Sequence, residues 1–242
     1  VNYIYYIFAF MEHVIIPPLS ELWYKGLIGS VLIIAILTYL LKKSSEKFQN
    51  NFMRLMSVVF AIAWFYAIIY EVSIDIWSVK DSLPLHLCRV SFIICIINFW
   101  KPKQWMFEWC IFLAIPAAVH AMLTPELTMG KSNWLLFYYY FTHAAMLFVP
   151  IFLSVVKKMK PRVNGWKNAF WYLQILVVIN LPLNFLINSN YMYLHHKPGV
   201  DNPFLIGDWP WYILVLEFVF FLHLLLIKYI FPPKKKLEEI KI

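Results

Sequence analysis

The chain has 242 residues, of which 62% are hydrophobic, 19% are aromatic and only 14% are charged. A water-soluble globular domain of this size would not tolerate such a composition, so the sequence indicates an integral membrane protein. The formal net charge of +8 fits attraction of basic loops to anionic inner-leaflet lipid, and it requires no nucleic-acid partner.

The first segment, residues 1–21, is aromatic and amphiphilic, but Glu12, His13, Pro17 and Pro18 interrupt it. This pattern predicts an interfacial N-terminal segment that lies on the membrane surface. A cleavable signal peptide is a poorer interpretation, because the segment has no basic n-region and no small-residue cleavage site.

Long apolar runs follow, and a run of about 20 residues is enough for a helix to cross the roughly 30 Å hydrocarbon layer. They predict an all-α fold, a seven-transmembrane helix bundle over residues 22–231. The predicted spans are residues 22–41, 52–73, 84–100, 105–123, 134–156, 168–187 and 210–231. The third span is the shortest and the least apolar, and we expect it to begin at Pro84.

Lysine and arginine predict the orientation, since short loops rich in these residues stay on the cytoplasmic side. Basic residues concentrate in the loops after the first, third and fifth spans and in the basic tail, residues 232–242. The alternate loops contain only Lys80, Lys131 and Lys197. The sequence therefore predicts a multi-pass protein of the cell membrane with its N-terminus outside and its C-terminus in the cytoplasm.

Polar residues gather in the outer half of the predicted bundle. Such side chains are costly in hydrocarbon unless they face other helices or a wet cavity, so their depth indicates where a site lies. The residues concerned are Glu71, His86, Cys88, Arg89, His120, Asn180 and Asn184. His143 lies about nine residues down the fifth span, or roughly 13 Å at 1.5 Å per residue. We expect a polar cavity in this half of the bundle.

One face of the third span carries small or polar residues at spacings of three and four, namely Cys88, Ser91, Cys95 and Asn98. We expect this face to contact other helices. Cys88 is either a small packing residue or a reactive thiol. The helix N-terminus and the neighbouring Arg89 both favour a thiolate, which supports the second interpretation.

A nucleophilic cysteine needs a base, usually a histidine from another element. His86 lies about 200° round the helix from Cys88 and is a poor candidate. His223 lies toward the cytoplasmic end of the last span, where we expect it to be too deep to meet Cys88. His120 and His143 remain, and the span boundaries do not decide between them. Either one, taken alone, is also explained as a structural hydrogen-bonding residue.

Four strings of sequence resemble the motifs of a known family. They are LPLHLC at 83–88, YFTHAAM at 140–146, NFLINSNYMYLHHKP at 184–198 and GDWPWYIL at 207–214. The likeness, over about residues 60–225, is to the YwaF-type bacterial integral membrane proteins. These belong with the eukaryotic transmembrane protein 164 family, whose vertebrate member moves polyunsaturated acyl chains between phospholipids to make ether lipids. The last two strings are the more specific.

The resemblance implies a membrane-embedded phospholipid acyltransferase or transacylase that needs no cofactor and uses phospholipid and lysophospholipid as substrates. Cys88 would be the nucleophile that carries the acyl group as a thioester, and His143 would be its catalytic partner. The residues expected to bind the lipid headgroup are His86, Arg89, Asn188, Asn190, Tyr191, Tyr193 and Lys197.

The residues expected to stabilise an oxyanion, or to support the polar site by hydrogen bonds, are Asn180, Asn184 and His120, together with the amides that begin the third span. Asn180 and Asn184 share a helix face, and they are equally well explained as interhelical hydrogen-bonding residues around Pro182.

Other classes of function use the same polar residues. A transporter or small-molecule-binding membrane protein would line a permeation site with them, although transporters usually place polar groups near the bilayer midplane. With water as the acceptor, the same dyad would make a cysteine-dependent lipid hydrolase. A scaffold role predicts that Cys88→Ala leaves the phenotype intact. No set of His, Cys, Asp and Glu has the spacing of metal ligands, so we expect no metal site.

Overall fold

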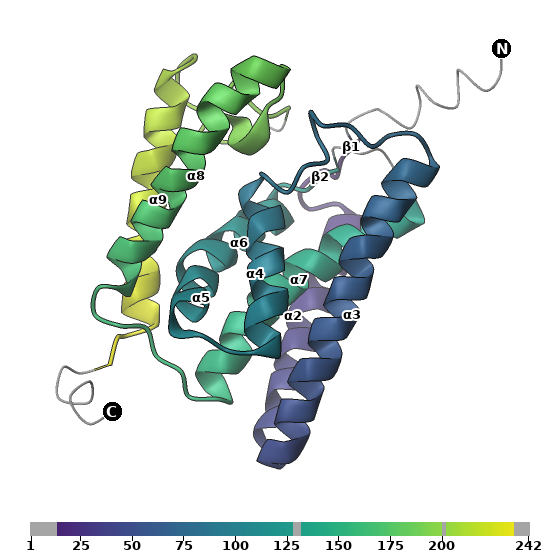
Figure 1. Cartoon of the computed structure of the whole chain (residues 1–242), viewed down its shortest axis with the longest axis vertical. Coiled ribbons are helices and arrows are strands. Elements are labelled where there is room, and N and C mark those ends of the chain that lie inside the picture. The colour runs from purple at the N-terminus through teal and green to yellow at the C-terminus, as the bar shows by residue number, and fades with distance from the viewer. Residues whose placement is uncertain (1–13, 128–131, 200–201, 235–242) are drawn as a thin grey trace.

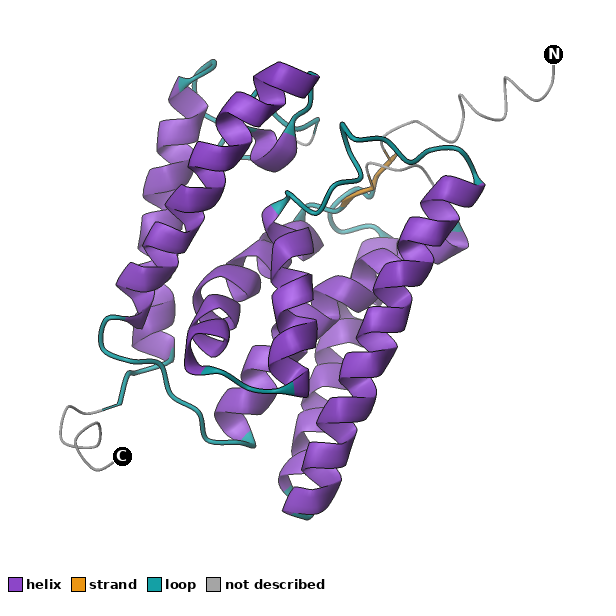
Figure 2. Cartoon of the chain, viewed as in Figure 1, coloured by secondary structure: helices purple, strands orange, loops and turns teal. Residues whose placement is uncertain are grey.

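The computed structural model describes residues 14–127, 132–199 and 202–234, which form a helical bundle (Figures 1 and 2). The N-terminal part of the predicted interfacial segment and most of the predicted basic tail lie outside these residues. The helices are α2 (Glu21–Lys42), α3 (Glu46–Ser73), α4 (Leu87–Trp100), α5 (Gln104–Trp109), α6 (Ile115–Leu123), α7 (Asn133–Val155), α8 (Gly165–Ile187) and α9 (Trp211–Ile230).

Two short helical elements and two short strands complete the fold. The π-helical turn η1 (Cys110–Ala114) joins α5 to α6, and the 3-10 turn η2 (Tyr191–Tyr193) follows α8. Strands β1 (Val14–Ile15) and β2 (Glu126–Leu127) pair antiparallel, with Val14 opposite Leu127.

Six helical stretches in the described part of the chain are long and apolar enough to cross a bilayer. They are α2, α3, the continuous α5–η1–α6 stretch, α7, α8 and α9. α4 has 14 residues and is shorter than these. The chain is therefore a multi-pass membrane protein, whereas the count of seven spans and the orientation stay predictions.

Serine caps explain where several helices begin. The Ser45 hydroxyl accepts a hydrogen bond from the Phe48 amide at 3.3 Å, so α3 starts at Glu46, six residues before the predicted apolar run. Ser20 caps α2 and Ser132 caps α7 in the same way. α4 begins at Leu87 with His86 as its N-cap, so the expected start at Pro84 is wrong.

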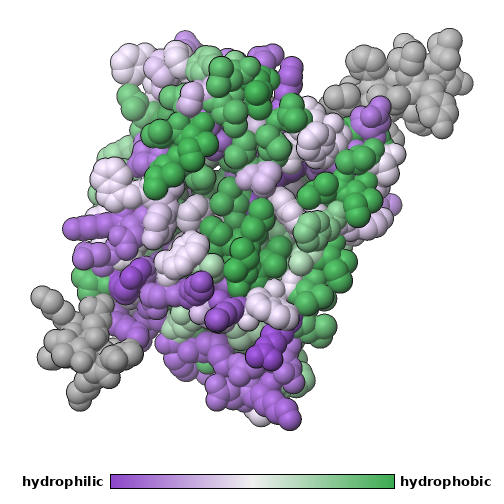
Figure 3. Space-filling model, in the orientation of Figure 1, coloured by the Kyte–Doolittle hydropathy of each residue, from purple (hydrophilic) through white to green (hydrophobic). Residues whose placement is uncertain are grey.

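The core of the bundle lies where α4, the η1 segment and α7 meet. Phenylalanines dominate it, and those with at most 1% of their surface exposed are Phe92, Phe99, Phe107, Phe112 and Phe152. α2 and α3 lie on one side of this core, and α8 and α9 run side by side at the other (Figure 1). The outer helices turn large apolar side chains outward, and Figure 3 shows apolar residues across the middle of the visible face.

The face of α4 that carries small and polar residues contacts other helices, as predicted. Ser91, Cys95 and Asn98 are fully buried. The Trp109 indole N–H donates to Ser91 Oγ at 3.0 Å, and the Sγ atoms of Cys95 and Cys110 lie 3.6 Å apart. Both cysteines are free thiols.

A buried ion pair fixes the loop between α7 and α8. The Glu108 carboxylate on α5 is completely buried, and Arg162 binds it through Nε and a terminal nitrogen, the latter at 2.6 Å from Oε2. The Arg162 backbone N–H and the Gln104 amide also donate to Glu108 Oε1, at 2.8 and 2.9 Å. Every contact holds the carboxylate in its charged form, which is the condition for burying a charge without a large penalty.

Close packing of α2 against α7 yields a stability prediction. A Cβ added at Gly26 would overlap the ring of Tyr140 on α7, whereas one added at Gly29 would meet nothing within 4 Å. We expect Gly26→Ala to lower the free energy of unfolding by about 1–3 kcal/mol, because the helices must separate to admit the methyl group. Thermal unfolding in detergent measures this, with Gly29→Ala as the matched control. Equal midpoints for the two variants would show that Tyr140 moves aside freely.

Candidate functional site

A cavity of about 450 Å³ opens between α3, α4, α6, α7, α8 and α9, beside strand β2. Its wall includes most of the polar residues that the sequence places in one half of the bundle: Glu71, His86, Cys88, Arg89, His120 and His143. Much of the remaining wall is apolar and comes from the inner faces of α8 and α9, with Leu173, Val177, Leu216, Val219 and Phe220. The cavity therefore combines a polar cluster with a surface suited to hydrocarbon.

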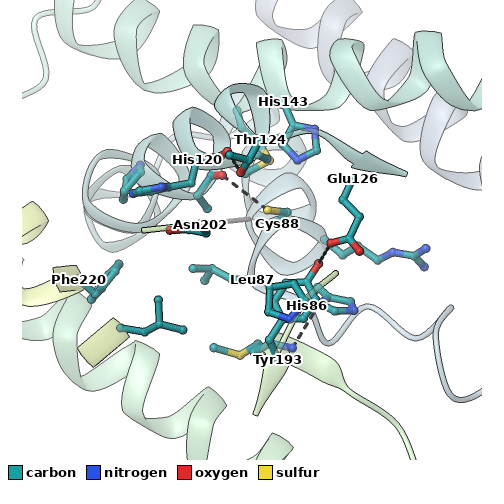
Figure 4. A pocket seen from close by; sticks show the side chains of 18 of the residues that line it. His86, Leu87, Cys88, His120, Thr124, Glu126, His143, Tyr193, Asn202 and Phe220 are labelled. Atoms are coloured by element: carbon teal, nitrogen blue, oxygen red, sulfur yellow. Dashed lines mark hydrogen bonds between the residues drawn. The ribbon is translucent and has the colours of Figure 1, made fainter. Parts of the chain in front are cut away.

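Cys88 enters the cavity from the first turn of α4 (Figure 4). Its Sγ lies 3.9 Å from the carbonyl oxygen of Ala117 on α6, the distance of a weak thiol hydrogen bond. The N-cap residue His86 makes no side-chain hydrogen bond to the start of α4. The first amides of this helix, which have no partner within the helix itself, are therefore left uncapped beside the thiol.

His143 lines the same cavity from α7 and has a defined tautomer. Its Nδ1 lies 2.7 Å from the carbonyl oxygen of Tyr139. A carbonyl oxygen only accepts, so Nδ1 carries the proton and the neutral ring keeps a free lone pair on Nε2. The Tyr139 ring packs against the imidazole with centroids 4.4 Å apart. His143 thus has the electronic form of a base.

His120 is paired with another histidine. Its Nε2 lies 3.1 Å from Nε2 of His223 on α9, and His223 Nδ1 lies 2.7 Å from the carbonyl oxygen of Val219. His223 therefore carries its proton on Nδ1, so His120 donates to it through Nε2. His223 lines the same cavity as Cys88, at a depth that the sequence analysis did not expect.

Arg89 and Glu71 form an ion pair at the edge of the cavity. One terminal nitrogen of Arg89 donates to Glu71 Oε1 at 3.2 Å, and the other donates to the Ser82 carbonyl oxygen at 2.5 Å. Glu71 is 4% exposed, and among the described residues its Oε2 has no hydrogen-bond partner. His86 accepts a hydrogen bond at Nδ1 from the Met192 amide at 3.3 Å, which holds it against η2.

Asn180 and Asn184 lie outside the cavity wall and are completely buried. The amide nitrogen of Asn180 donates to the Leu85 carbonyl oxygen at 3.1 Å. That of Asn184 donates to the Tyr191 carbonyl oxygen at 2.8 Å, and its oxygen accepts from Ser189 and from the Tyr191 amide. Asn184 therefore organises the turn after α8, and Asn180 binds the loop before α4, so these bonds run to loop and turn residues and not between helices as the structural interpretation expected.

The loop after α8 is bound mainly to itself and to the loop before α4. Asn188 ends α8 in the left-handed conformation, and Asn190 binds the backbone of His195 and His196. The Tyr191 hydroxyl donates to the Val79 carbonyl oxygen at 2.7 Å. These residues lie outside the cavity wall and shape its rim.

Two further residues of this loop were predicted to bind headgroups. Lys197 lies 3.9 Å from a carboxylate oxygen of Asp208, outside the cavity wall. Tyr193 lines the cavity and donates to Glu126 Oε2 at 3.2 Å. Burial, followed by the Glu126 carboxylate, raises the pKa of Tyr193, so its phenol keeps the proton that it donates.

The cavity also contains polar residues that the sequence analysis did not single out for the site. They are Glu126, Tyr138, Tyr139, Asn202 and Glu217. Within the described residues, no group of three or more His, Cys, Asp and Glu side chains is placed to hold a metal ion.

Comparison with known proteins links the chain to one family. A profile of the TMEM164 family matches residues 12–228, which is most of the chain and contains every residue of the cavity wall. No curated protein matches the sequence. No solved structure matches it either. On the extent of the profile match, the chain belongs to the TMEM164 family of multi-pass membrane proteins.

Proposed function

We propose that the chain is a phospholipid acyltransferase that works through a Cys88–His143 dyad and a thioester acyl-enzyme. The observation that carries this proposal is the hydrogen bond from His143 Nδ1 to the Tyr139 carbonyl oxygen. It leaves Nε2 as a free acceptor in the cavity that Cys88 enters. A thiol at a helix start and a histidine held as a base are the components of nucleophilic catalysis by cysteine.

In the first half-reaction, His143 Nε2 takes the proton from the Cys88 thiol, and the thiolate attacks the ester carbonyl carbon of a donor phospholipid. The ester C–O bond then breaks. His143 returns the proton to the departing alkoxide, which leaves as a lysophospholipid, while the acyl group stays on Cys88 as a thioester.

In the second half-reaction, His143 takes a proton from the hydroxyl of a lysophospholipid acceptor, whose oxygen attacks the thioester carbonyl. The C–S bond breaks, and the proton passes from His143 to the Cys88 thiolate. The uncapped amides at the start of α4 supply the first hydrogen bond to the oxyanion in both halves. Water in place of the acceptor would give hydrolysis.

The cavity wall is apolar on one side and polar on the other, and this arrangement supports a lipid substrate. Leu173, Val177 and Phe220 provide a surface for an acyl chain, and hydrocarbon gains roughly 0.8 kcal/mol for each buried methylene group. The polar side, with Arg89 and Tyr138, is where a headgroup would lie. An acyl ester between the two would place its carbonyl near Cys88.

Intact mass spectrometry tests the thioester directly. We expect the purified protein, incubated with phospholipid in detergent, to gain the mass of an acyl group that neutral hydroxylamine removes. Cys88→Ser and Cys88→Ala are expected to lack the thioester. Cys95→Ala, which removes a buried thiol from the same helix, is the matched control and is expected to keep it. An adduct that survives in Cys88→Ala, or its absence from the unmodified protein with several donor lipids, would sink the mechanism.

A further inference from the structure

Asn202 is a polar residue of the cavity wall for which the dyad mechanism gives no role. It lies in the irregular loop between η2 and α9, and its side chain enters the cavity with Cys88 (Figure 4). Its Oδ1 accepts a hydrogen bond from the Phe204 amide at 2.9 Å, and its carbonyl oxygen accepts from the Leu205 amide at 3.0 Å. These two bonds make a local turn that fixes the side-chain amide.

The fixed amide leaves a donor unused. Because Oδ1 is turned toward the Phe204 backbone, the planar amide presents Nδ2 on its other edge. Within the described residues, Nδ2 donates to no group, although it carries two hydrogens. An oriented donor without a partner at the wall of a cavity is available to a ligand.

Several other neutral side-chain donors of the cavity wall are already engaged. The Thr124 hydroxyl donates to the His120 carbonyl oxygen at 3.1 Å, and the Tyr139 hydroxyl donates to the Ala121 carbonyl oxygen at 2.5 Å. The Tyr193 phenol donates to Glu126.

Two more hydroxyl groups, those of Thr142 and Tyr138, belong to the cavity wall. Thr142 donates to carbonyl oxygens of its own helix. The Tyr138 phenol has no hydrogen-bond partner in the described part of the chain, but it lies within the electrostatic reach of Arg89 and Glu71. Within the part of the chain that the structure describes, Asn202 is thus a free neutral donor on the Cys88 side of the cavity; the Nε2–H of His86, whose Nδ1 accepts from the Met192 amide, is another.

We propose that Asn202 is a catalytic residue whose Nδ2 donates a hydrogen bond to the oxyanion that forms when Cys88 attacks an acyl carbonyl. It would be the second donor, beside the α4 amide, at the same oxygen. The inference rests on the proposed acyl transfer and names a residue that this mechanism lacks. One side-chain donor of this kind contributes about 10²–10³-fold to the rate of comparable reactions.

The Asn202→Ser variant removes the free Nδ2 donor but keeps the side-chain acceptor that forms the turn. A serine hydroxyl still accepts from the Phe204 amide, as serine does in such turns, but it cannot extend a second donor into the cavity. We expect the rate of Cys88 acylation by phospholipid to fall by about 10²-fold or more, with the KM for the lipid little changed. Asn202→Asp, which keeps the acceptor and places a negative charge beside the oxyanion, is expected to be slower still.

Alkylation of Cys88 by iodoacetamide distinguishes this role from a structural one. Alkylation forms no oxyanion, so its rate in Asn202→Ser is expected to equal that of the unmodified protein. Parallel loss of alkylation and acylation would mean that Asn202 only supports the dyad, and unchanged acylation would mean that it donates to nothing in the reaction; either result overturns this inference alone. No acyl adduct on the unmodified protein overturns the proposed function and this inference with it.

Discussion

Replacing His143 with glutamine is expected to lower the rate of Cys88 acylation by roughly 10²–10⁴-fold, the usual contribution of a general base. Glutamine can still donate to the Tyr139 carbonyl oxygen, so the packing of α7 is preserved. Its amide has no basic nitrogen, so the thiol keeps its proton. A time course of acyl-adduct formation by intact mass measures the effect.

His120→Gln is the matched control for this experiment. It replaces the imidazole donor to His223 in the same cavity with an amide, which costs at most about 1 kcal/mol and is expected to change the rate by less than about tenfold. A larger loss in His120→Gln than in His143→Gln would reverse the assignment of the base. Iodoacetamide alkylation adds a second measurement, because removing the base slows both reactions.

Arg162→Ala is expected to lower the free energy of unfolding by about 3–5 kcal/mol, because it leaves the Glu108 carboxylate buried without a counterion. The Glu108 side chain is completely buried, whereas that of Arg162 is 45% exposed. Removing the glutamate is therefore the milder change, since the arginine left behind can reach solvent. The expected order of midpoints in thermal unfolding is unmodified protein, Glu108→Ala, then Arg162→Ala.

The double variant Arg162→Ala with Glu108→Gln tests the physical reason. Its glutamine at position 108 carries no charge and can still accept a hydrogen bond from Gln104. We therefore expect the double variant to regain most of the stability that Arg162→Ala loses. If the double variant is no more stable than Arg162→Ala, the loss comes from the missing arginine packing and backbone anchoring.

The membrane-spanning helices could largely be predicted from composition. The predicted run 210–231 is α9 (Trp211–Ile230) within one residue at each end, because polar or proline-containing segments bound it directly. The start of α3 could not be found in this way, since Glu46 and the polar residues after it are helical although they are not apolar. The π-helical turn η1 (Cys110–Ala114) inside the continuous α5–η1–α6 stretch was not predicted, although Pro116 just after it cannot donate a hydrogen bond to the carbonyl four residues earlier.

The candidate site was harder to predict, because it depends on which side chains from different helices lie at the same depth in the bundle. Counting residues along a straight helix predicted that His223 lies too deep in the bundle to share a cavity with Cys88. Its side chain extends toward the start of α9, where its ring binds the carbonyl oxygen of Val219 one turn earlier. Cys88, His120 and His143 became candidates through their positions along the predicted spans, and only the choice of His143 over His120 came from short motifs that resemble a family. Asn202 lies in an irregular loop without periodicity, so no pattern pointed to it.

Under the proposed function, the length of α4 has a consequence for how a lipid would reach Cys88. Fourteen residues make a helix of about 21 Å, well short of the roughly 30 Å hydrocarbon layer. Figure 1 shows α4 starting below the level at which α3 ends, with the connecting loop descending to it. Lipid esters lie where the headgroup region meets the hydrocarbon. Under the proposed function, a thiol at the start of so short a helix would be reached from within the bilayer, and the donor lipid would approach Cys88 by moving sideways within its leaflet.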